Sequence, residues 1–154
     1  MKLTRKSDYA LRALVTLALR YGEGPVPNRE LAEQNDIPKR FLEQIMQELK
    51  VKGWVVSSPG RDGGFELGVR PEQLTMGQIV RLFDGMLAPI ACTSTSYYEA
   101  CSQEATCRFR RVLLEIRNHS SQLMDRATLA DLVLSQPVRH EEVFQRDFEE
   151  GAGI

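Results

Sequence analysis

The sequence lacks any long apolar run, because charged residues interrupt its longest apolar stretches within a helical turn or two. It therefore predicts no membrane span and no membrane partner. The first residues also lack the basic start, apolar middle and small-residue cleavage site of a signal peptide, so we expect a cytoplasmic protein. A nucleophile–base pair, a phosphate-binding loop and a paired-histidine site are missing as well, and we predict no enzyme.

An excess of charge of either sign is also missing, since the net charge of the 154 residues is −1. Such a balance does not by itself point to a nucleic-acid partner. Cationic side chains nevertheless outnumber carboxylates within residues 1–70, and carboxylates outnumber cations in the remainder. This direction fits a basic binding end, although the asymmetry is too small to decide the question.

A periodic apolar pattern is the first feature that is present. Apolar residues recur at three- and four-residue spacing across residues 9–21, which predicts an amphipathic helix. The polar side chains of residues 7–9 can cap its start, and the glycines and prolines of residues 22–27 end it. A short second helix is expected over residues 29–34, with Asn28 as its cap and as a candidate for contact with DNA.

A third helix is predicted over residues 39–50, directly after a tight connection. The positions expected to face inward are Phe41, Leu42, Ile45, Met46 and Leu49. The face left free carries the polar residues Lys39, Arg40, Glu43, Gln44 and Gln47. Two helices joined by a short turn form the helix-turn-helix pattern, in which the second helix enters the major groove of DNA. The alternative is an ordinary helical pair with a solvated face.

Two short β-prone runs, residues 54–57 and 65–69, follow the third helix. The segment between them is dense in turn-forming residues and contains Arg61, Gly63 and Gly64. The two glycines alone would indicate a plain hairpin turn, where glycine permits backbone conformations that other residues resist. Placed directly after a helix-turn-helix, the two strands predict a wing that binds DNA, with Arg61 reaching the phosphate backbone or the minor groove.

All three cysteines of the chain lie in one loop, after a helix that Thr75 can cap. Core cysteines are usually scattered, and an odd number in a cytoplasmic chain argues against disulfides. Structural zinc favours four ligands with paired short spacings, which Cys92, Cys101 and Cys107 lack. Iron–sulfur clusters are held by thiolates and accept one non-cysteine ligand. The spacing thus ranks a cluster first, a bare thiol sensor second and zinc third.

From residue 108 to about residue 134 the chain has one long helical pattern without proline or glycine. A helix of that length would reach about 40 Å, which is more than so small a domain needs for itself. We expect it to form a homodimer by packing against its copy, the alternative being a helix folded back on its own domain. Residues 136–154 are polar and acidic, and we expect a disordered tail.

These elements predict a mainly α-helical fold with a small β-wing. The expected organisation is a winged helix-turn-helix DNA-binding domain over residues 1–85, a cysteine-bearing loop over residues 86–107, a dimerisation helix over residues 108–135, and the tail.

Several blocks of the sequence occur in the order found in one family. They include DYALRAL at residues 8–14, FLEQI at residues 41–45, GRDGGF at residues 60–65, and the three-cysteine loop. Over roughly residues 1–135 the chain resembles the IscR/NsrR family of bacterial iron–sulfur transcriptional regulators. The resemblance implies a homodimer that binds double-stranded promoter DNA, and an iron–sulfur cluster, [4Fe-4S] ahead of [2Fe-2S], whose state sets the affinity for DNA.

By this resemblance Cys92, Cys101 and Cys107 are the cysteine ligands, although the first spacing is longer than is usual in the family. IscR-like members place a histidine three residues after the last cysteine, where this chain has Arg110. NsrR-like members use an acidic residue at the start of the first helix, donated by the other subunit, and Asp8 stands there in this chain. Asp8 thus has two interpretations, a helix cap and a cluster ligand.

The predicted function is that of a DNA-binding regulator, expected to be a repressor, whose cluster responds to nitric oxide, redox state or iron status. Ligation by Asp8 would make the cluster labile, because a hard oxygen donor matches it less well than a thiolate. Two alternatives stay open. One is a cluster-free, thiol-based redox regulator, and the other is a zinc-stabilised winged-helix module that binds proteins.

Overall fold

The computed structural model describes residues 2–61 and 63–144. Its elements in chain order are α1 (Arg5–Leu19), α2 (Asn28–Gln34), α3 (Lys39–Val51), β1 (Val55–Ser58), β2 (Gly64–Leu67), η1 (Pro71–Gln73), α4 (Met76–Asp84), η2 (Ala91–Thr93), α5 (Arg110–Arg126), α6 (Leu129–Leu134) and α7 (His140–Phe144). The structure is mainly helical with one small antiparallel sheet, which confirms the predicted fold class. None of the described helices is both long and apolar enough to cross a membrane.

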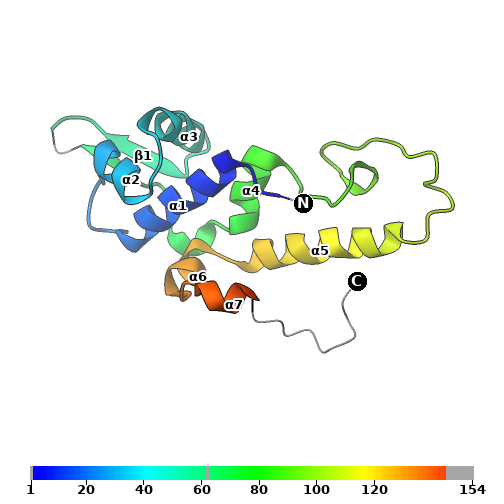
Figure 1. Ribbon diagram of the computed structural model, residues 1–154. Helices are drawn as coiled ribbons and strands as arrows, with labels where there is room; N and C mark the ends of the chain where they lie inside the picture. Colours follow the sequence, from blue (N-terminus) through cyan, green and yellow to red (C-terminus); the bar gives the residue numbers. More distant parts are fainter. Residues whose placement is uncertain (1, 62, 145–154) are drawn as a thin grey trace.

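The molecule has two parts, which Figure 1 shows side by side. Helices α1–α4 and the two strands form the winged lobe, which we define as residues 2–85. The loop after α4 and helix α5 extend away from it, and we call residues 86–126 the cysteine lobe. Helix α6 then returns to the winged lobe and packs against α1.

The hydrophobic core lies in the winged lobe, around α1. Helices α3, α4 and α6 all pack against α1, whose inward face is apolar at helical spacing. The side chains that are essentially inaccessible to solvent include Leu14 and Leu17 of α1, Leu42, Ile45, Met46 and Leu49 of α3, and Leu129 of α6. Each such side chain contributes about 1.5–3 kcal/mol by leaving water, so this burial holds the helix-turn-helix together.

Helix α1 begins earlier than the sequence pattern predicts. Its N-cap is Thr4, whose hydroxyl accepts a hydrogen bond from the backbone N–H of Ser7 at 3.3 Å. The prediction of a cap at residues 7–9 is therefore wrong, and Asp8 lies inside the first turn. Buried Asp84, at the end of α4, accepts hydrogen bonds from the Thr4 backbone N–H (3.0 Å) and hydroxyl (2.5 Å). These bonds tie the start of α1 to the point where the cysteine loop begins.

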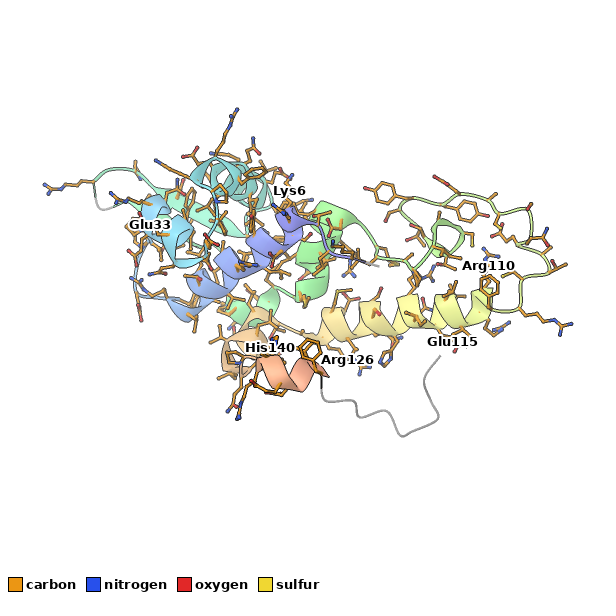
Figure 2. The ribbon with its side chains drawn as sticks, in the orientation of Figure 1. Lys6, Glu33, Arg110, Glu115, Arg126 and His140 are labelled. Carbon is orange, nitrogen blue, oxygen red and sulfur yellow. The ribbon has the colours of Figure 1, made fainter. Side chains whose placement is uncertain are left out.

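Lys6 connects three helices of the winged lobe. Its Nζ lies 2.6 Å from a carboxylate oxygen of Glu48 on α3 and 5.3 Å from the ring centroid of Phe83 on α4. Figure 2 shows Lys6 at the start of α1, between these two helices. The position of α3 is thereby linked to the helix that leads into the cysteine loop.

The wing is a hairpin in which β1 and β2 pair from Val55↔Leu67 to Ser58↔Gly64. Val26, in the loop before α2, extends this pairing. Its N–H donates to the Phe65 carbonyl at 2.8 Å, and its carbonyl accepts from the Phe65 N–H at 2.9 Å. The wing is thus fastened to the segment that enters the helix-turn-helix, a contact absent from the sequence prediction.

The predicted long helix is interrupted, so the prediction of one helix to residue 134 is wrong. The backbone of Ala127 is extended, and the hydroxyl of Thr128 accepts from the N–H of Asp131 to cap α6. The freed backbone groups bond to the winged lobe. The Met76 N–H donates to the Ala127 carbonyl, and the Leu129 N–H donates to the Leu74 carbonyl, each at 2.8 Å. The final part of the predicted dimerisation helix therefore folds back on its own domain.

Part of the predicted tail is helical. Residues 140–144 form the short helix α7, in which the His140 and Phe144 rings meet edge to face with centroids 5.0 Å apart. No residue of α7 is buried, and residues 145–154 lie outside the described part of the chain, so the disordered tail stays a prediction.

Candidate functional site

Helix α3 presents a polar face to solvent, as a DNA-reading helix requires. Its opposite face is anchored in the core, so the exposed face is fixed in orientation. The predicted contact residues Lys39, Arg40, Glu43, Gln44 and Gln47 are all exposed on this helix. The structure therefore brings five of the sequence-predicted DNA-binding residues onto one surface.

Asn28 lies on α2, beside that exposed face. It is the first residue of α2, makes no helix-capping bond and is half-buried. Its Nδ2 donates to Oε1 of Glu43 at 3.3 Å, while its Oδ1 is buried without a partner among the described residues. The geometry thus gives Asn28 contact with a residue of α3, and the capping prediction is wrong.

The wing places Arg61 in solvent at its tip. Gly63 and Gly64 serve here in a different way from the one predicted, because neither has a backbone φ in the left-handed region. A Cβ on Gly63 would overlap the carbonyl oxygen of Ser58, and one on Gly64 would overlap the carbonyl oxygen of Val26. The glycines are needed for close approach of backbone to backbone.

Phe41 contradicts the sequence prediction, because its side chain is 53% exposed instead of facing the core. It lies on the edge of the apolar stripe of α3, one residue before fully buried Leu42. Its ring meets the ring of Tyr9 edge to face, with centroids 6.4 Å apart. Helical periodicity alone does not separate such an edge position from a core position.

The three cysteines line one cavity of about 400 Å³ in the cysteine lobe. Cys92 lies in η2 and is buried, Cys107 precedes α5 and is half-buried, and Cys101 is exposed. All three are free thiols. Ile90 and Phe109 also line the cavity and give it apolar walls.

Within the described residues, no group of three or more histidine, cysteine or acidic side chains is compact enough to hold one metal ion. A structural zinc ion takes four ligands within about 2.3 Å. A cluster of several irons distributes its thiolates over different irons, so three thiols that line one cavity are a donor set that such a cluster can use.

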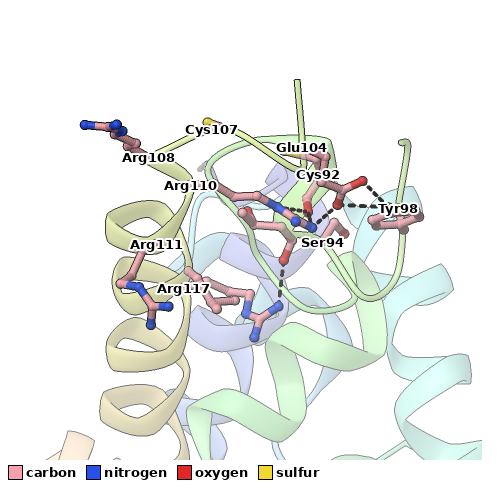
Figure 3. Close-up of a pocket in the computed structure, with 11 residues that line it drawn as sticks. Cys92, Ser94, Tyr98, Glu104, Cys107, Arg108, Arg110, Arg111 and Arg117 are labelled. Carbon is pink, nitrogen blue, oxygen red and sulfur yellow. Dashed lines mark hydrogen bonds and ion pairs between the residues drawn. The ribbon is translucent and has the colours of Figure 1, made fainter. Parts of the chain in front are cut away.

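Two arginines of α5 hold the backbone of the loop beside Cys92. Arg110 donates from Nε and Nη2 to the Cys92 carbonyl at 3.2 and 2.8 Å, and Arg117 donates from Nη1 to the Thr93 carbonyl at 2.7 Å. Figure 3 shows both side chains reaching from α5 toward the loop, whereas Arg108 points away from it. Sequence reasoning missed this role, for which the only signal was the concentration of arginines after Cys107.

Glu104 completes this arrangement. Its carboxylate pairs with Arg110 and accepts hydrogen bonds from the Tyr98 hydroxyl at 2.7 and 2.9 Å (Figure 3). These hydrogen bonds raise the pKa of Tyr98, because the neutral phenol is the donor to the carboxylate. Arg110 and Glu104 thus stabilise the loop geometry in which Cys92 faces the cavity.

Asp8 lies on α1 and does not line the cysteine cavity of its own chain. Its carboxylate accepts two hydrogen bonds from Arg12, at 3.0 Å from Nε and 2.7 Å from Nη2. The side chain remains 45% exposed, so a second molecule has access to it. The structure therefore does not bring Asp8 and the cysteines together within one chain.

Comparisons with known proteins agree with this architecture. Residues 3–135 match the Rrf2 family, described as an iron-dependent transcriptional regulator. The HTH-type transcriptional regulator CymR of Bacillus subtilis is 32% identical over 132 residues, which are 86% of this chain and 89% of that protein. The HTH-type transcriptional regulator IscR of Aliivibrio salmonicida is 30% identical over 139 residues, 90% of this chain and 81% of that protein. The solved structure of CymR, titled the global cysteine regulator of B. subtilis, has a TM-score of 0.74 and 28% identity, covering 89% of this chain and 99% of that one.

Proposed function

Because the chain belongs to the Rrf2 family of winged-helix transcriptional regulators, we propose that it is a repressor controlled by an iron–sulfur cluster. In this proposal a homodimer binds promoter DNA, and the cluster is held by Cys92, Cys101 and Cys107. The observation that carries the proposal is the cavity that all three cysteines of the chain share. The description of the family as iron-dependent supports the same reading.

The donor set of this cavity suits such a cluster. Three thiols and apolar walls match the sulfur ligation and the apolar surroundings that hold and tune such clusters. The carboxylate of Glu104 also lines the cavity and is engaged by Arg110 and Tyr98, as the carboxylate of Asp8 is engaged by Arg12. We propose that Asp8 from a second copy of the chain is the fourth ligand. Its place in the first turn of α1, where NsrR-like members carry an acidic ligand, and its partly exposed side chain support that assignment.

The homodimer is proposed on the surface of α5. No residue of this helix is buried, and apolar side chains recur along one side of it at helical spacing. The stripe begins at Phe109, the N-cap residue before α5, and continues through Val112, Ile116 and Leu123. These side chains are 65%, 57%, 44% and 57% exposed. A contiguous apolar stripe of this kind is typical of a protein–protein interface, and twofold packing is the commonest way of covering one.

Regulation follows from the contacts between the two lobes. The chemistry that a bound cluster supplies is reactivity toward nitric oxide or oxygen and dependence on the iron supply. On the protein side, the loop that carries the cysteines begins at Asp84, which is bonded to Thr4 at the start of α1. Helix α1 in turn contacts α3 through Lys6 and Glu48. A rearrangement of the loop would thus displace the helices that read DNA.

The test is an anaerobic ultraviolet–visible spectrum with iron and sulfide analysis. We expect broad visible absorbance and matching iron and sulfide in the wild type, and a weakened signal in Asp8→Ala. Glu33→Ala is the matched control, because Glu33 also pairs with an arginine one helical turn away, at 2.7 Å, on the surface. Glu104→Gln tests whether the Glu104 carboxylate, which lines the same cavity, is the fourth ligand in place of Asp8. An iron-free protein after anaerobic reconstitution would overturn the proposal.

A thiol-based regulator without a cluster is the second candidate. The exposure of the Cys101 thiol favours it, as does similarity to a protein titled a global cysteine regulator. This candidate predicts a colourless, iron-free protein whose affinity for DNA changes on thiol oxidation and returns on reduction. Cys101→Ser would then abolish the response to the oxidant.

A further inference from the structure

Phe41 is a large apolar side chain on the helix face that carries the polar DNA-binding candidates. It is 53% exposed and is not among the side chains packed against the core. Arg40 precedes it, and Gln44 lies one helical turn farther along the same exposed surface. Burial in the core therefore does not account for an aromatic residue at this place.

The ring of Phe41 is held in position by contacts at its inner edge. Tyr9 of α1 meets it edge to face at 6.4 Å, and the Arg12 guanidinium lies 5.8 Å from the centroid of the Tyr9 ring. Arg12 is itself fixed by its two bonds to Asp8. These contacts restrict the Phe41 ring before binding, so the ring loses less conformational entropy when it contacts a ligand.

The first residues of a recognition helix reach the base edges in the major groove. Thymine presents a methyl group there, and phenylalanine is one of the side chains that contact this methyl. Arg40 and Gln44 supply hydrogen-bonding groups, whereas the Phe41 ring offers only apolar surface. We propose that Phe41 contacts a thymine methyl group in each half-site and so determines part of the base preference. This inference rests on DNA binding by α3.

The probe is a set of duplexes recovered by the wild-type protein from a random-sequence pool. Each thymine of a recovered duplex is replaced in turn by uracil, which removes only the methyl group. We expect one position in each half-site at which this replacement lowers wild-type affinity about fourfold, the effect of exposing one methyl-sized group. Phe41→Ala should bind the thymine and uracil duplexes equally, and Phe41→Leu should still prefer thymine.

Val51→Ala is the matched control. Val51 is 86% exposed and is the last residue of α3, at the end away from the base edges. This variant should keep the wild-type response to uracil, and circular dichroism checks that each variant is folded. Wild-type binding that is insensitive to every replacement, or an unchanged response in Phe41→Ala, would overturn the proposal while DNA binding stands. A pool that yields no enriched duplex would overturn DNA binding together with it.

Discussion

The winged lobe and the cysteine lobe differ in what holds them together. The winged lobe has an apolar core to which α1–α4 and both strands contribute, closed by Leu129 of α6. In the described part of the cysteine lobe, only Cys92, Thr93 and Ser94 are buried, and α5 contributes no buried side chain. Hydrogen bonds from Arg110 and Arg117 to loop carbonyls take the place of a core.

The winged lobe is therefore stabilised by the burial of apolar side chains, whereas the loop of the cysteine lobe is held mainly by polar contacts. Polar contacts contribute little net free energy when water competes, so they offset only part of the entropy lost when a loop is ordered. In the proposed complex, a second copy against α5 and a group bound to the cysteines would each add contacts to this lobe.

Two leucines, one from each lobe, provide the strongest test. Leu14→Ala removes a completely buried side chain of α1, and we expect the free energy of unfolding to fall by about 2–5 kcal/mol. Leu123→Ala on α5 removes a side chain that is 57% exposed, so its effect should stay within about 0.5 kcal/mol at low protein concentration. Urea unfolding followed by circular dichroism measures both.

The same pair of variants also reports on the homodimer. As protein concentration rises, Leu123→Ala should lower the free energy of unfolding by more than about 0.5 kcal/mol, because the stability gained from association depends on concentration. Leu14→Ala should cost a similar amount at every concentration. Equal losses for Leu123→Ala at all concentrations would mean that α5 packs only within its own chain.

The wing gives a smaller effect within the winged lobe. Gly64→Ala places a Cβ against the Val26 carbonyl and should lower the free energy of unfolding by about 2–3 kcal/mol, the cost of overpacking. Gly60→Ala is the control, because Gly60 has a φ of 104° but open space around its Cβ. We expect Gly60→Ala to lower the free energy of unfolding by about 1 kcal/mol, because only backbone strain opposes the added Cβ. Thermal unfolding of both variants measures the difference, and equal losses would show that the wing is not fastened to Val26.

The winged lobe could be predicted from the sequence because its apolar residues follow one helical period. Leu42, Ile45, Met46 and Leu49 are buried as that period requires. The prediction fails where a core position and an exposed position at the edge of the stripe give the same apolar pattern. Phe41 is apolar, adjoins the stripe and is exposed. A periodic pattern shows which residue types recur, but it does not show how much of the helix face a neighbouring helix covers.

The break before α6 was visible in the sequence but outweighed by the apolar pattern. Thr128 and Asp131 have the spacing of a capping box, and the structure uses them as one. The long loop was predictable only as a loop, because no period indicates where its backbone runs. The contacts that fix it join residues far apart in the chain, such as Arg117 and Thr93, and nothing local encodes them.

The smallest expected effect concerns Thr128 and Asp131 at the start of α6, where the chain returns to the winged lobe. The Thr128 hydroxyl and backbone N–H donate to the Asp131 carboxylate, and these hydrogen bonds lower the pKa of Asp131. A carboxyl whose pKa is lower in the folded state stabilises the fold above its unfolded pKa. That stabilisation is lost as the pH falls through the folded pKa, so the loss should occur below about pH 4.

Carboxyl NMR titration should find a depressed pKa for Asp131 in the wild type and a value nearer to the ordinary one in Thr128→Ala. Asp131→Asn should flatten the dependence of thermal stability on pH below about pH 4, while Thr128→Ser should preserve it because serine keeps the hydroxyl donor. The change is expected to be small, since Asp131 is exposed to solvent. An unchanged Asp131 pKa in Thr128→Ala would mean that the cap does not hold the carboxylate. The attachment of α6 to the winged lobe would then rest on the backbone bonds of Ala127 and Leu129 and on the burial of the Leu129 side chain, without a contribution from the cap.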